Sequence, residues 1–390
     1  MAGTRICYFG TYEADYPGNR VLIEGLRRSG VEVVECHEPL WEKSRTKDRR
    51  YFGLRSVLGL SVRYAWTCIR LATRAVRLGP IDAVIVGFNG HADLLMARFV
   101  ANAYQVPLVF NPMLSIYDTL VIDRAYFAQR SLAARLLLTI ERTLCRLPDC
   151  VLMDAREHFV LFHELLGVPW AKYRQLYFGA DDRQFRREKY DHGKRVFRVL
   201  FYGKFQPLQG VEYIIKAAAL LRDYRDVRFR VIGTGPDYPR VRTLAEQERL
   251  ENVDFVDWVD FGRLPSEIAE ADVCLGVFGT TGKVRRSIAN KVIQALAVGR
   301  PVITARSPAS EQLLTDEAEV LFCPPGDPAA LAEAILRLRG DQALCDRLAE
   351  GGYLRYLRCC SPEAVGARAV EYLQGLARRT QVLADASRPQ

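Results

Sequence analysis

The chain has 390 residues, which is long for a single hydrophobic core and favours two domains of about 150–200 residues each. Hydrophobic residues make up 49% and charged residues 26%, which excludes the disordered and fibrous classes. The net charge of +9 favours an acidic partner, either a phosphorylated small molecule, an anionic membrane surface or nucleic acid. No recognition-helix motif or RNA-binding signature accompanies this charge, so we expect no nucleic-acid partner.

Features that depend on the cell compartment indicate a cytoplasmic protein. The ten cysteines show neither a C-x-x-C pair nor a zinc-like spacing, which favours reduced and mostly buried thiols. The N-terminus enters a strand directly, without the apolar core of a signal peptide. The best candidate for a membrane span, Ser56 to Val76, contains Arg63, Arg70 and Arg74, so we expect it not to cross a bilayer.

Short apolar segments alternate with longer amphipathic segments along almost the whole chain. In the first half the predicted strands are residues 5–9, 31–35, 82–87, 107–111 and 150–154. In the second half they are residues 198–203, 227–233, 253–257, 272–278, 301–305 and 319–323. Buried strands separated by helices indicate parallel sheets. We therefore expect an α/β fold of two doubly wound, Rossmann-like domains that face a cleft.

A polar, charged segment near residues 178–195 marks the expected domain boundary. We predict an N-terminal domain over 1–180, a hinge over 181–194 and a C-terminal domain over 195–360. No strand follows the last helical pattern, so a helix over 361–380 is expected to cross back to the N-terminal domain. A disordered tail is expected over 381–390. Ligands of open parallel sheets bind beyond the carboxyl ends of the strands, and the loops there are the candidates for chemistry.

Two strand-to-helix loops of the second half suit a phosphate group. Gly203 lets a ligand approach the backbone and Lys204 adds a positive charge, although an ordinary turn with a solvated lysine is equally consistent. Gly233 and Gly235 begin an incomplete G-x-G-x-x-G, in which Tyr238 holds the third glycine position. This incomplete fingerprint argues against a nucleotide-dependent oxidoreductase. A tight turn near a nucleotide and a purely structural turn both remain open.

The third loop, residues 279–291, is rich in cations and hydroxyl groups. Its sequence G-T-T-G-K-V-R-R-S-I-A-N-K contains four basic residues and no acidic residue: Lys283, Arg285, Arg286 and Lys291. Asn290 is predicted to cap the helix that follows. Clustered cations repel one another unless an anion lies among them, so we interpret the loop as a cradle for an oxyanion or diphosphate. The alternative is a solvated basic loop.

The order of these motifs resembles the nucleotide-sugar half of a GT-B glycosyltransferase. The motifs are strand–G-K–loop–G–helix (198–221), V-I-G-x-G-P (231–236), V-x-F-V-D-W-V (253–259), L-P-x-x-I-A-E-A-D-V (264–273) and A-V-G-R-P-V-I (297–303). Segments 18–35 and 82–91 resemble the N-terminal half of the same enzymes. The resemblance is nearest to the large retaining family 4 (glycosyl transferases group 1) and covers nearly the whole chain.

The resemblance implies transfer of a sugar from a nucleotide diphosphate-sugar to an acceptor hydroxyl, with retention of configuration. The residues that it places at the donor are Gly203 and Lys204 at the diphosphate, Gly233 and Gly235 near the nucleotide, Val256 at the base, Asn290 and Lys291 at the phosphate, and Gln294 at the ribose.

The chain departs from the family pattern at three positions. Gln209 replaces the second diphosphate lysine, Gln294 replaces the ribose glutamate, and Arg286 occupies the place of the first glutamate. We expect Lys283, Arg285, Arg286 and Lys291 to replace the missing lysine, with Arg286 acting in catalysis. No convincing D-x-D motif is present, so we predict a metal-independent reaction without a cofactor. A catalytically silent GT-B-like binding or partner subunit is the alternative function.

On the acceptor side, we predict catalytic roles for His91 and Asp118. His91 follows the third strand and could orient the acceptor, or it is a surface histidine. Asp118 could accept a proton from the acceptor hydroxyl, or it caps a helix. The loop after the first strand is expected to face the acceptor through Gly10, Thr11, Tyr12 and Arg20, although Arg20 could instead be solvated.

The segment 43–77 carries ten basic residues against one acid, Asp48, with apolar residues interleaved at helical spacing. This composition is typical of a helix that lies on an anionic membrane surface. It would make the protein peripheral on the inner face of the cell membrane and favour a lipid-linked acceptor over another glycan. The alternative is an amphipathic crossover helix that packs on the sheet and exposes its arginines to water.

Overall fold

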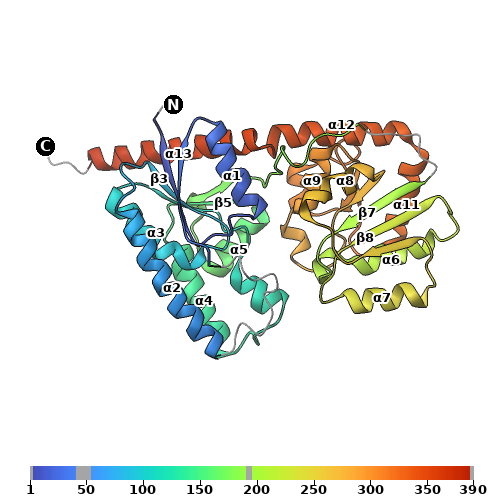
Figure 1. Ribbon diagram of the computed structural model, residues 1–390, viewed down its shortest axis with the longest axis horizontal. Coiled ribbons are helices and arrows are strands. Elements are labelled where there is room, and N and C mark those ends of the chain that lie inside the picture. The colour runs from blue at the N-terminus through green and yellow to red at the C-terminus, as the bar shows by residue number, and fades with distance from the viewer. Residues whose placement is uncertain (1–2, 41–53, 190–195, 387–390) are drawn as a thin grey trace. The chain divides into compact units, whose positions relative to one another are not determined.

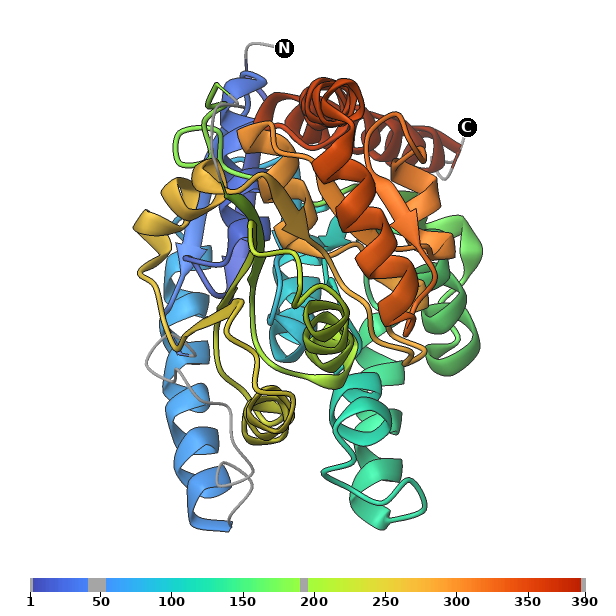
Figure 2. The same ribbon diagram turned by 90° about the vertical axis from the view of Figure 1, so that its right-hand side faces the viewer.

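The computed structural model describes residues 3–40, 54–189 and 196–386 (Figures 1 and 2). The chain divides into two compact units. Unit 1 comprises Met1–Tyr177 and Pro362–Gln390, and unit 2 comprises Phe178–Ser361. Each unit contains one six-stranded sheet in which all neighbouring strands are parallel. The α/β fold class predicted from the alternating sequence pattern is therefore confirmed.

The sheet of unit 1 has the strand order β2-β1-β3-β4-β5-β6. Its strands are β1 Arg5–Gly10, β2 Glu32–His37, β3 Ala83–Val86, β4 Leu108–Phe110, β5 Cys150–Met153 and β6 Tyr173–Gln175. Strands β3, β4 and β5 are buried at every position, as expected for central strands of a parallel sheet. The sequence pattern missed β6, because this edge strand has three residues and only Tyr173 is buried.

Helices cover both faces of this sheet. On one face, side chains of α1 (Pro17–Arg28) and α13 (Pro362–Ala386) share a core with β1, β3 and β5. On the other face lie α2 (Leu54–Ala75), α3 (Leu94–Tyr104), α4 (Leu132–Cys145) and α5 (Arg156–Leu166). Among its described residues, the unit also has three short helical turns: η2 His91–Asp93, η3 Asp118–Asp123 and η4 Trp170–Lys172.

Helix α13 belongs to unit 1 because two glycines let it lie directly against α1. A Cβ atom on Gly25 would lie 2.2 Å from the Pro362 carbonyl oxygen, and one on Gly366 would lie 2.0 Å from the Gly25 carbonyl oxygen. Arg28 and Glu363 also form an ion pair across the two helices. The disordered tail predicted from residue 381 is wrong up to Ala386, because the strong helix formers Leu and Ala continue α13 to that point. Residues 387–390 lie outside the described residues.

The sheet of unit 2 has the order β12-β11-β10-β7-β8-β9. Its strands are β7 Phe197–Tyr202, β8 Val227–Ile232, β9 Val253–Val256, β10 Val273–Leu275, β11 Val302–Ala305 and β12 Leu321–Cys323. The helices are α6 Val211–Leu220, α7 Tyr238–Gln247, α8 Leu264–Glu270, α9 Asn290–Val298, α10 Pro308–Leu313, α11 Pro328–Gly340 and α12 Gln342–Cys359. Short turns η5 Pro207–Gln209, η6 Phe261–Arg263 and η7 Val284–Arg286 lie in the loops.

Both sheets reverse their strand order once, which locates a binding crevice by topology. In unit 1 the reversal falls between β1 and β3, and in unit 2 it falls between β7 and β10. Loops that leave neighbouring strands in opposite directions leave room for a ligand at this point. Among the described residues, no helix combines the length and apolar character that a membrane span requires.

Candidate functional site

The loops after β7, β8 and β10 pack against one another at the strand-order reversal of unit 2. The Gly279 amide donates to the Leu208 carbonyl at 3.2 Å, and the Phe205 amide donates to the Thr234 carbonyl at 2.9 Å. A Cβ atom on Gly233 would lie 2.0 Å from the Gly203 carbonyl oxygen, and one on Gly235 would lie 2.4 Å from that of Phe205. These two glycines therefore bring one backbone close to another.

The side chain of Lys291 lies inside this group of loops. It comes from the first turn of α9, which follows the β10 loop, and it is 7% exposed. Its Nζ donates to Gln209 Oε1 at 2.6 Å and lies 3.7 Å from the centre of the Phe201 ring. A Cβ atom on Gly203 would lie 2.9 Å from the same Nζ. The structure thus brings together Gly203, Gln209 and Lys291, three residues predicted from the sequence to bind a donor.

The surroundings of Lys291 oppose its positive charge. Burial holds the pKa of the ammonium well below its usual range. The amide dipoles at the N-terminus of α9 add to this effect, because that end of a helix disfavours cations. Among the residues that the structure describes, no carboxylate pairs with Lys291. An ammonium in such a position is stabilised when an anion binds beside it.

Gln294 lies one turn after Lys291 on α9 and is also buried, at 5% exposed. The Tyr202 hydroxyl lies 3.1 Å from Gln294 Oε1 and 3.0 Å from the Lys291 carbonyl oxygen. Burial raises the pKa of Tyr202 well above its usual range, so this hydroxyl stays protonated and donates. Tyr202 therefore fixes the orientation of the Gln294 amide, although no sequence motif singled out this tyrosine.

The remaining predicted donor residues differ in exposure. Lys204 and Arg285 are exposed, whereas Lys283 and Arg286 are half-buried. The prediction that Asn290 caps α9 is wrong, because the helix begins at Asn290 and its cap residue is Ala289, which has no side-chain acceptor. The Val256 carbonyl, predicted to meet a base, accepts the Gly233 amide at 2.8 Å.

One hydroxyl of the β10 loop is buried without a partner. Thr281 Oγ1 is inaccessible to solvent and has no hydrogen-bond partner among the described residues. A buried hydroxyl without a partner is costly, so a ligand that hydrogen-bonds there would stabilise the loop. This residue belongs to the hydroxyl-bearing stretch that the sequence marked as a candidate oxyanion cradle.

The corresponding strand ends of unit 1 hold a buried carboxyl group, Asp93. Its Oδ2 accepts the Thr11 amide at 2.6 Å and the Thr11 hydroxyl at 2.9 Å, and its Oδ1 lies 3.2 Å from the Tyr64 hydroxyl. Burial raises the pKa of Asp93 to about 6. Tyr12, predicted to face an acceptor, is instead buried, because its aromatic ring belongs to the hydrophobic core. Its hydroxyl donates to Glu35 Oε2 at 2.7 Å. Arg20 is exposed.

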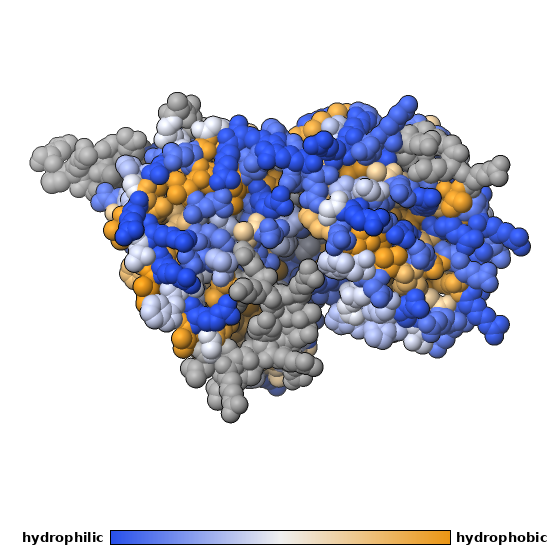
Figure 3. All heavy atoms as spheres, in the orientation of Figure 1, coloured by the Kyte–Doolittle hydropathy of each residue, from blue (hydrophilic) through white to orange (hydrophobic). Residues whose placement is uncertain are grey.

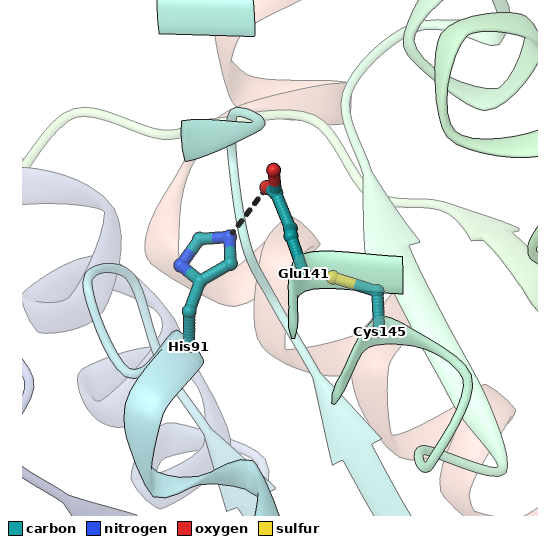
Figure 4. Close-up of side chains that lie close together, drawn as sticks. All are labelled: His91, Glu141 and Cys145. Atoms are coloured by element: carbon teal, nitrogen blue, oxygen red, sulfur yellow. Dashed lines mark ion pairs between the residues drawn. The ribbon is translucent and has the colours of Figure 1, made fainter. Parts of the chain in front are cut away.

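His91 lies in the interior of unit 1, beside Glu141 and Cys145 of α4 (Figure 4). It is 3% exposed, its ring meets that of Phe110 edge-on, and its Nε2 lies 3.7 Å from Glu141 Oε1. Burial lowers the pKa of His91 to about 4, so its imidazole is neutral at physiological pH. The alternative that His91 is a surface histidine is therefore wrong. A neutral imidazole also supplies no positive charge that could stabilise a reacting group.

Glu141 organises the loop that leads to Asp118. Its carboxylate accepts the amides of Ile116 and Tyr117 at 2.7 and 2.8 Å and the Ser115 hydroxyl at 3.1 Å. Burial raises the pKa of Glu141 to about 6. Asp118 is 3% exposed and begins η3 directly after this loop. Both carboxylate oxygens of Glu141 already accept hydrogen bonds from this loop. We therefore describe the cluster of His91, Glu141 and Cys145 as an internal support of the loop and not as a metal site.

Sequence reasoning missed Asp93 and Glu141. The one signal for Glu141 was its place in the buried stripe of an amphipathic helix, with Ala134 and Cys145.

Comparison with known proteins identifies the class of this molecule. Residues 196–341, which include the whole neighbourhood of Lys291, match the family described as "Glycosyl transferases group 1". The chain is a glycosyltransferase with the GT-B fold.

Relatives of this glycosyltransferase include the "Probable glycosyltransferase WbjE" of Pseudomonas aeruginosa, 27% identical over 68% of both chains. The "Phosphatidyl-myo-inositol mannosyltransferase" of Mycobacterium leprae is 28% identical over 40% of each chain, so this match spans less than half of the relative. Among solved structures, "Anabaena Alr3699/HepE in complex with UDP" has a TM-score of 0.69 at 15% identity and covers 96% of this chain and 100% of its own. This structural likeness shows the fold.

Proposed function

We propose that the glycosyltransferase takes its sugar from a nucleotide diphosphate-sugar and that Lys291 binds the diphosphate in unit 2. The observation that carries this proposal is the buried Lys291 ammonium, which has an amide and an aromatic ring as neighbours but no carboxylate among the described residues. A diphosphate would supply the missing negative charge. The UDP bound in the related Anabaena structure belongs to the same chemical class.

A second buried cation of unit 2 shows why Lys291 is different. Arg300 is 1% exposed, and its guanidinium donates to the carbonyl oxygens of Ala269, Glu188 and Lys189 at 2.7, 2.9 and 3.2 Å. Backbone carbonyl oxygens accept hydrogen bonds from its planar guanidinium, so Arg300 has a structural role. Among the described residues, Lys291 has one acceptor, the side-chain oxygen Gln209 Oε1, for three ammonium hydrogens. Its remaining donors are available to a ligand.

The proposed chemistry needs charge stabilisation more than a nucleophile. Negative charge grows on the diphosphate as the bond to the sugar breaks, and a preorganised cation in a dry site stabilises that charge. Lys291 would act here together with Lys204, Lys283, Arg286 and the Thr281 hydroxyl. Retention of configuration and membership of family 4 follow from the sequence resemblance and remain part of the proposal, as does independence of a metal ion.

The acceptor belongs to the same proposal. A hydroxyl group of a glycan or of a lipid-linked glycan is the class that we expect. The mannosyltransferase among the relatives is named after a phospholipid, phosphatidyl-myo-inositol, which supports the lipid-linked form. His91 and Asp118 are interior residues of unit 1, so we expect them to shape the acceptor loops without touching the reacting atoms.

Thermal unfolding in the presence of nucleotides tests the donor site. The full chain is heated with UDP, GDP, ADP, TDP or CMP, each with and without Mg²⁺. A ligand at a hundred times its dissociation constant stabilises the folded state by about 2.7 kcal/mol. We expect one diphosphate to raise the midpoint by several degrees, equally in both metal conditions.

Lys291→Met supplies the decisive variant, because Met keeps the length of the side chain and removes the charge. We expect it to weaken diphosphate binding about a hundredfold. Lys216→Met is the matched control, since this lysine is exposed on α6 beside Tyr213 and should leave binding unchanged. Equal binding by the Lys291→Met variant would contradict the assigned site. No shift with any nucleotide would instead favour a silent partner subunit, the alternative function.

A further inference from the structure

Three neighbouring helices of unit 1 expose apolar side chains on their outer sides. These are Val62, Trp66 and Ile69 of α2, Leu95 and Phe99 of α3, and Leu132, Leu136 and Ile140 of α4, with exposed fractions between 47% and 82%. Helix α3 contacts both α2 and α4, so the three helices form one layer. We call their exposed side the α2–α4 surface. Figure 3 shows hydrophobic and hydrophilic side chains interleaved along this edge of unit 1.

The exposed apolar residues are regularly placed. On α2 they recur at Val62, Trp66 and Ile69, which is the spacing of one helix face. The opposite face of the same helix, with Thr67, Leu71 and Ala75, is buried against the sheet. An amphipathic crossover helix needs one apolar face only, so the second face calls for a second apolar neighbour. The basic residues of segment 43–53 lie outside the described residues.

The charge of the α2–α4 surface has a single sign. The three helices contain seven arginines, no lysine and one acid, Glu141, which is 2% exposed and faces the interior. Arg63 and Arg135 are exposed beside the apolar residues. Arg70 and Arg74 pair with Glu38, which comes from the end of β2. An apolar surface rimmed by arginine matches lipid phosphates above acyl chains.

We propose that the α2–α4 surface binds the face of an anionic lipid bilayer. Trp66, Phe99 and Leu136 would enter the boundary between headgroups and acyl chains, while Arg63 and Arg135 bind lipid phosphates. A second copy of the chain is a poorer occupant, because a twofold interface would place this arginine-rich surface against itself. The helices lie on the surface and do not cross it, in agreement with the lack of a spanning helix among the described residues.

Vesicle flotation with the full chain tests this surface without reference to nucleotide binding or turnover. The protein is mixed with vesicles of phosphatidylcholine that contain or lack phosphatidylglycerol. We expect binding to the anionic vesicles and at least about tenfold weaker binding to the neutral ones, with loss of binding at high salt. In brominated anionic vesicles, the fluorescence of Trp66 should be quenched.

Two pairs of variants separate the apolar and the charged contributions. Trp66→Ser with Phe99→Ser, and Arg63→Glu with Arg135→Glu, should each reduce binding to anionic vesicles about tenfold or more. Leu220→Ser with Leu357→Ser is the control, because these leucines are 56% and 42% exposed on α6 and α12 of unit 2. All of these side chains are exposed, so the unfolding midpoints should stay within about 2 °C of the wild type.

Three other results would each overturn the proposal. Equal binding to neutral and anionic vesicles would remove the role of the arginines. If the control variant and the variant of Trp66 and Phe99 bound anionic vesicles equally well, the membrane contact would lie elsewhere on the protein. A dimer that dissociates in the Trp66, Phe99 variant, with no vesicle binding by the wild type, would show that the surface binds a second copy.

Discussion

The two strand-order reversals of this glycosyltransferase bury charges of opposite sign. In unit 2 the buried Lys291 ammonium has an amide oxygen as its one hydrogen-bond partner among the described residues. In unit 1 the buried Asp93 carboxyl accepts both the amide and the hydroxyl of Thr11. We propose that a ligand balances the first group, whereas the second accepts hydrogen bonds from its own chain. Equivalent places in the two sheets therefore hold a candidate ligand site in one unit and an internal brace in the other.

Under the proposed function, the two units divide the work of the reaction unequally. Two buried acids of unit 1, Asp93 and Glu141, hold the loops after β1 and β4 in place through backbone amides. Neither is exposed at a surface where a substrate hydroxyl could reach it. Under the proposed function, chemistry at a donor phosphate falls to unit 2, and these acids of unit 1 determine the shape of nearby loops. The following experiments test this division, from the largest expected effect to the smallest.

The largest effect is expected for Asp93→Leu. This change leaves the Thr11 amide and hydroxyl buried without an acceptor, and we expect a loss of about 3 kcal/mol in the free energy of unfolding. Urea unfolding near about pH 5 measures it best, because Asp93 is then largely neutral and the difference reports hydrogen bonds. Glu371→Leu is the control, since this exposed acid pairs with Arg368 on the surface of α13 and should cost under about 0.5 kcal/mol. Similar losses for both variants would mean that Asp93 does not brace the loop.

The contrast between the units explains what the sequence could and could not predict. Of the twelve strands in the part of the chain that the structure describes, eleven follow from apolar periodicity, because parallel strands must be buried on both faces. Gly203, Gln209 and Lys291 were selected by their places after strands or at a helix start, and the fold brings them together. The hydrogen bond between Lys291 and Gln209, 82 residues apart, depends on how two loops pack and has no local signal.

The missed residues share one physical cause. An acidic residue in a helix or loop is expected to be exposed, so nothing in the sequence pointed to Asp93, and Glu141 was marked only by its place in the buried stripe of α4. Their burial is tolerated because backbone amides at distant positions, Thr11 for Asp93 and Tyr117 for Glu141, donate to them. His91 was placed correctly in the loop after β3, yet its burial against Phe110 could not be read from its neighbours in the sequence.

A smaller effect is expected for the pH dependence of Asp93. The pKa of its carboxyl is about 6 in the folded chain and about 3.9 in an unfolded one. The folded state therefore binds more protons between these values, and the stability that Asp93 contributes falls as pH rises from about 4 to about 6. Asp93→Asn keeps an acceptor and cannot ionise. Its stability relative to the wild type should rise by about 2 kcal/mol across that window and then level off.

Urea unfolding of both proteins between about pH 4 and pH 8 measures this difference. Contributions from Glu141, whose pKa is also raised to about 6, are present in both proteins and cancel. A difference that stays constant with pH would show that Asp93 remains charged in the folded chain.

The smallest predicted effect has the opposite sign and belongs to unit 2. Without ligand, Lys291→Met should raise the free energy of unfolding by about 1 kcal/mol at neutral pH, because it removes a charge that burial disfavours. The pKa of Lys291 is lowered in the folded chain, so the unfolded chain binds more protons below about pH 10. The wild type should therefore regain stability as pH rises, and the advantage of the variant should shrink.

Lys216→Met should change the stability by less than about 0.5 kcal/mol. A Lys291→Met variant that is less stable than the wild type would show that the ammonium braces the loops, as Asp93 does in unit 1, and that the two strand-order reversals are alike.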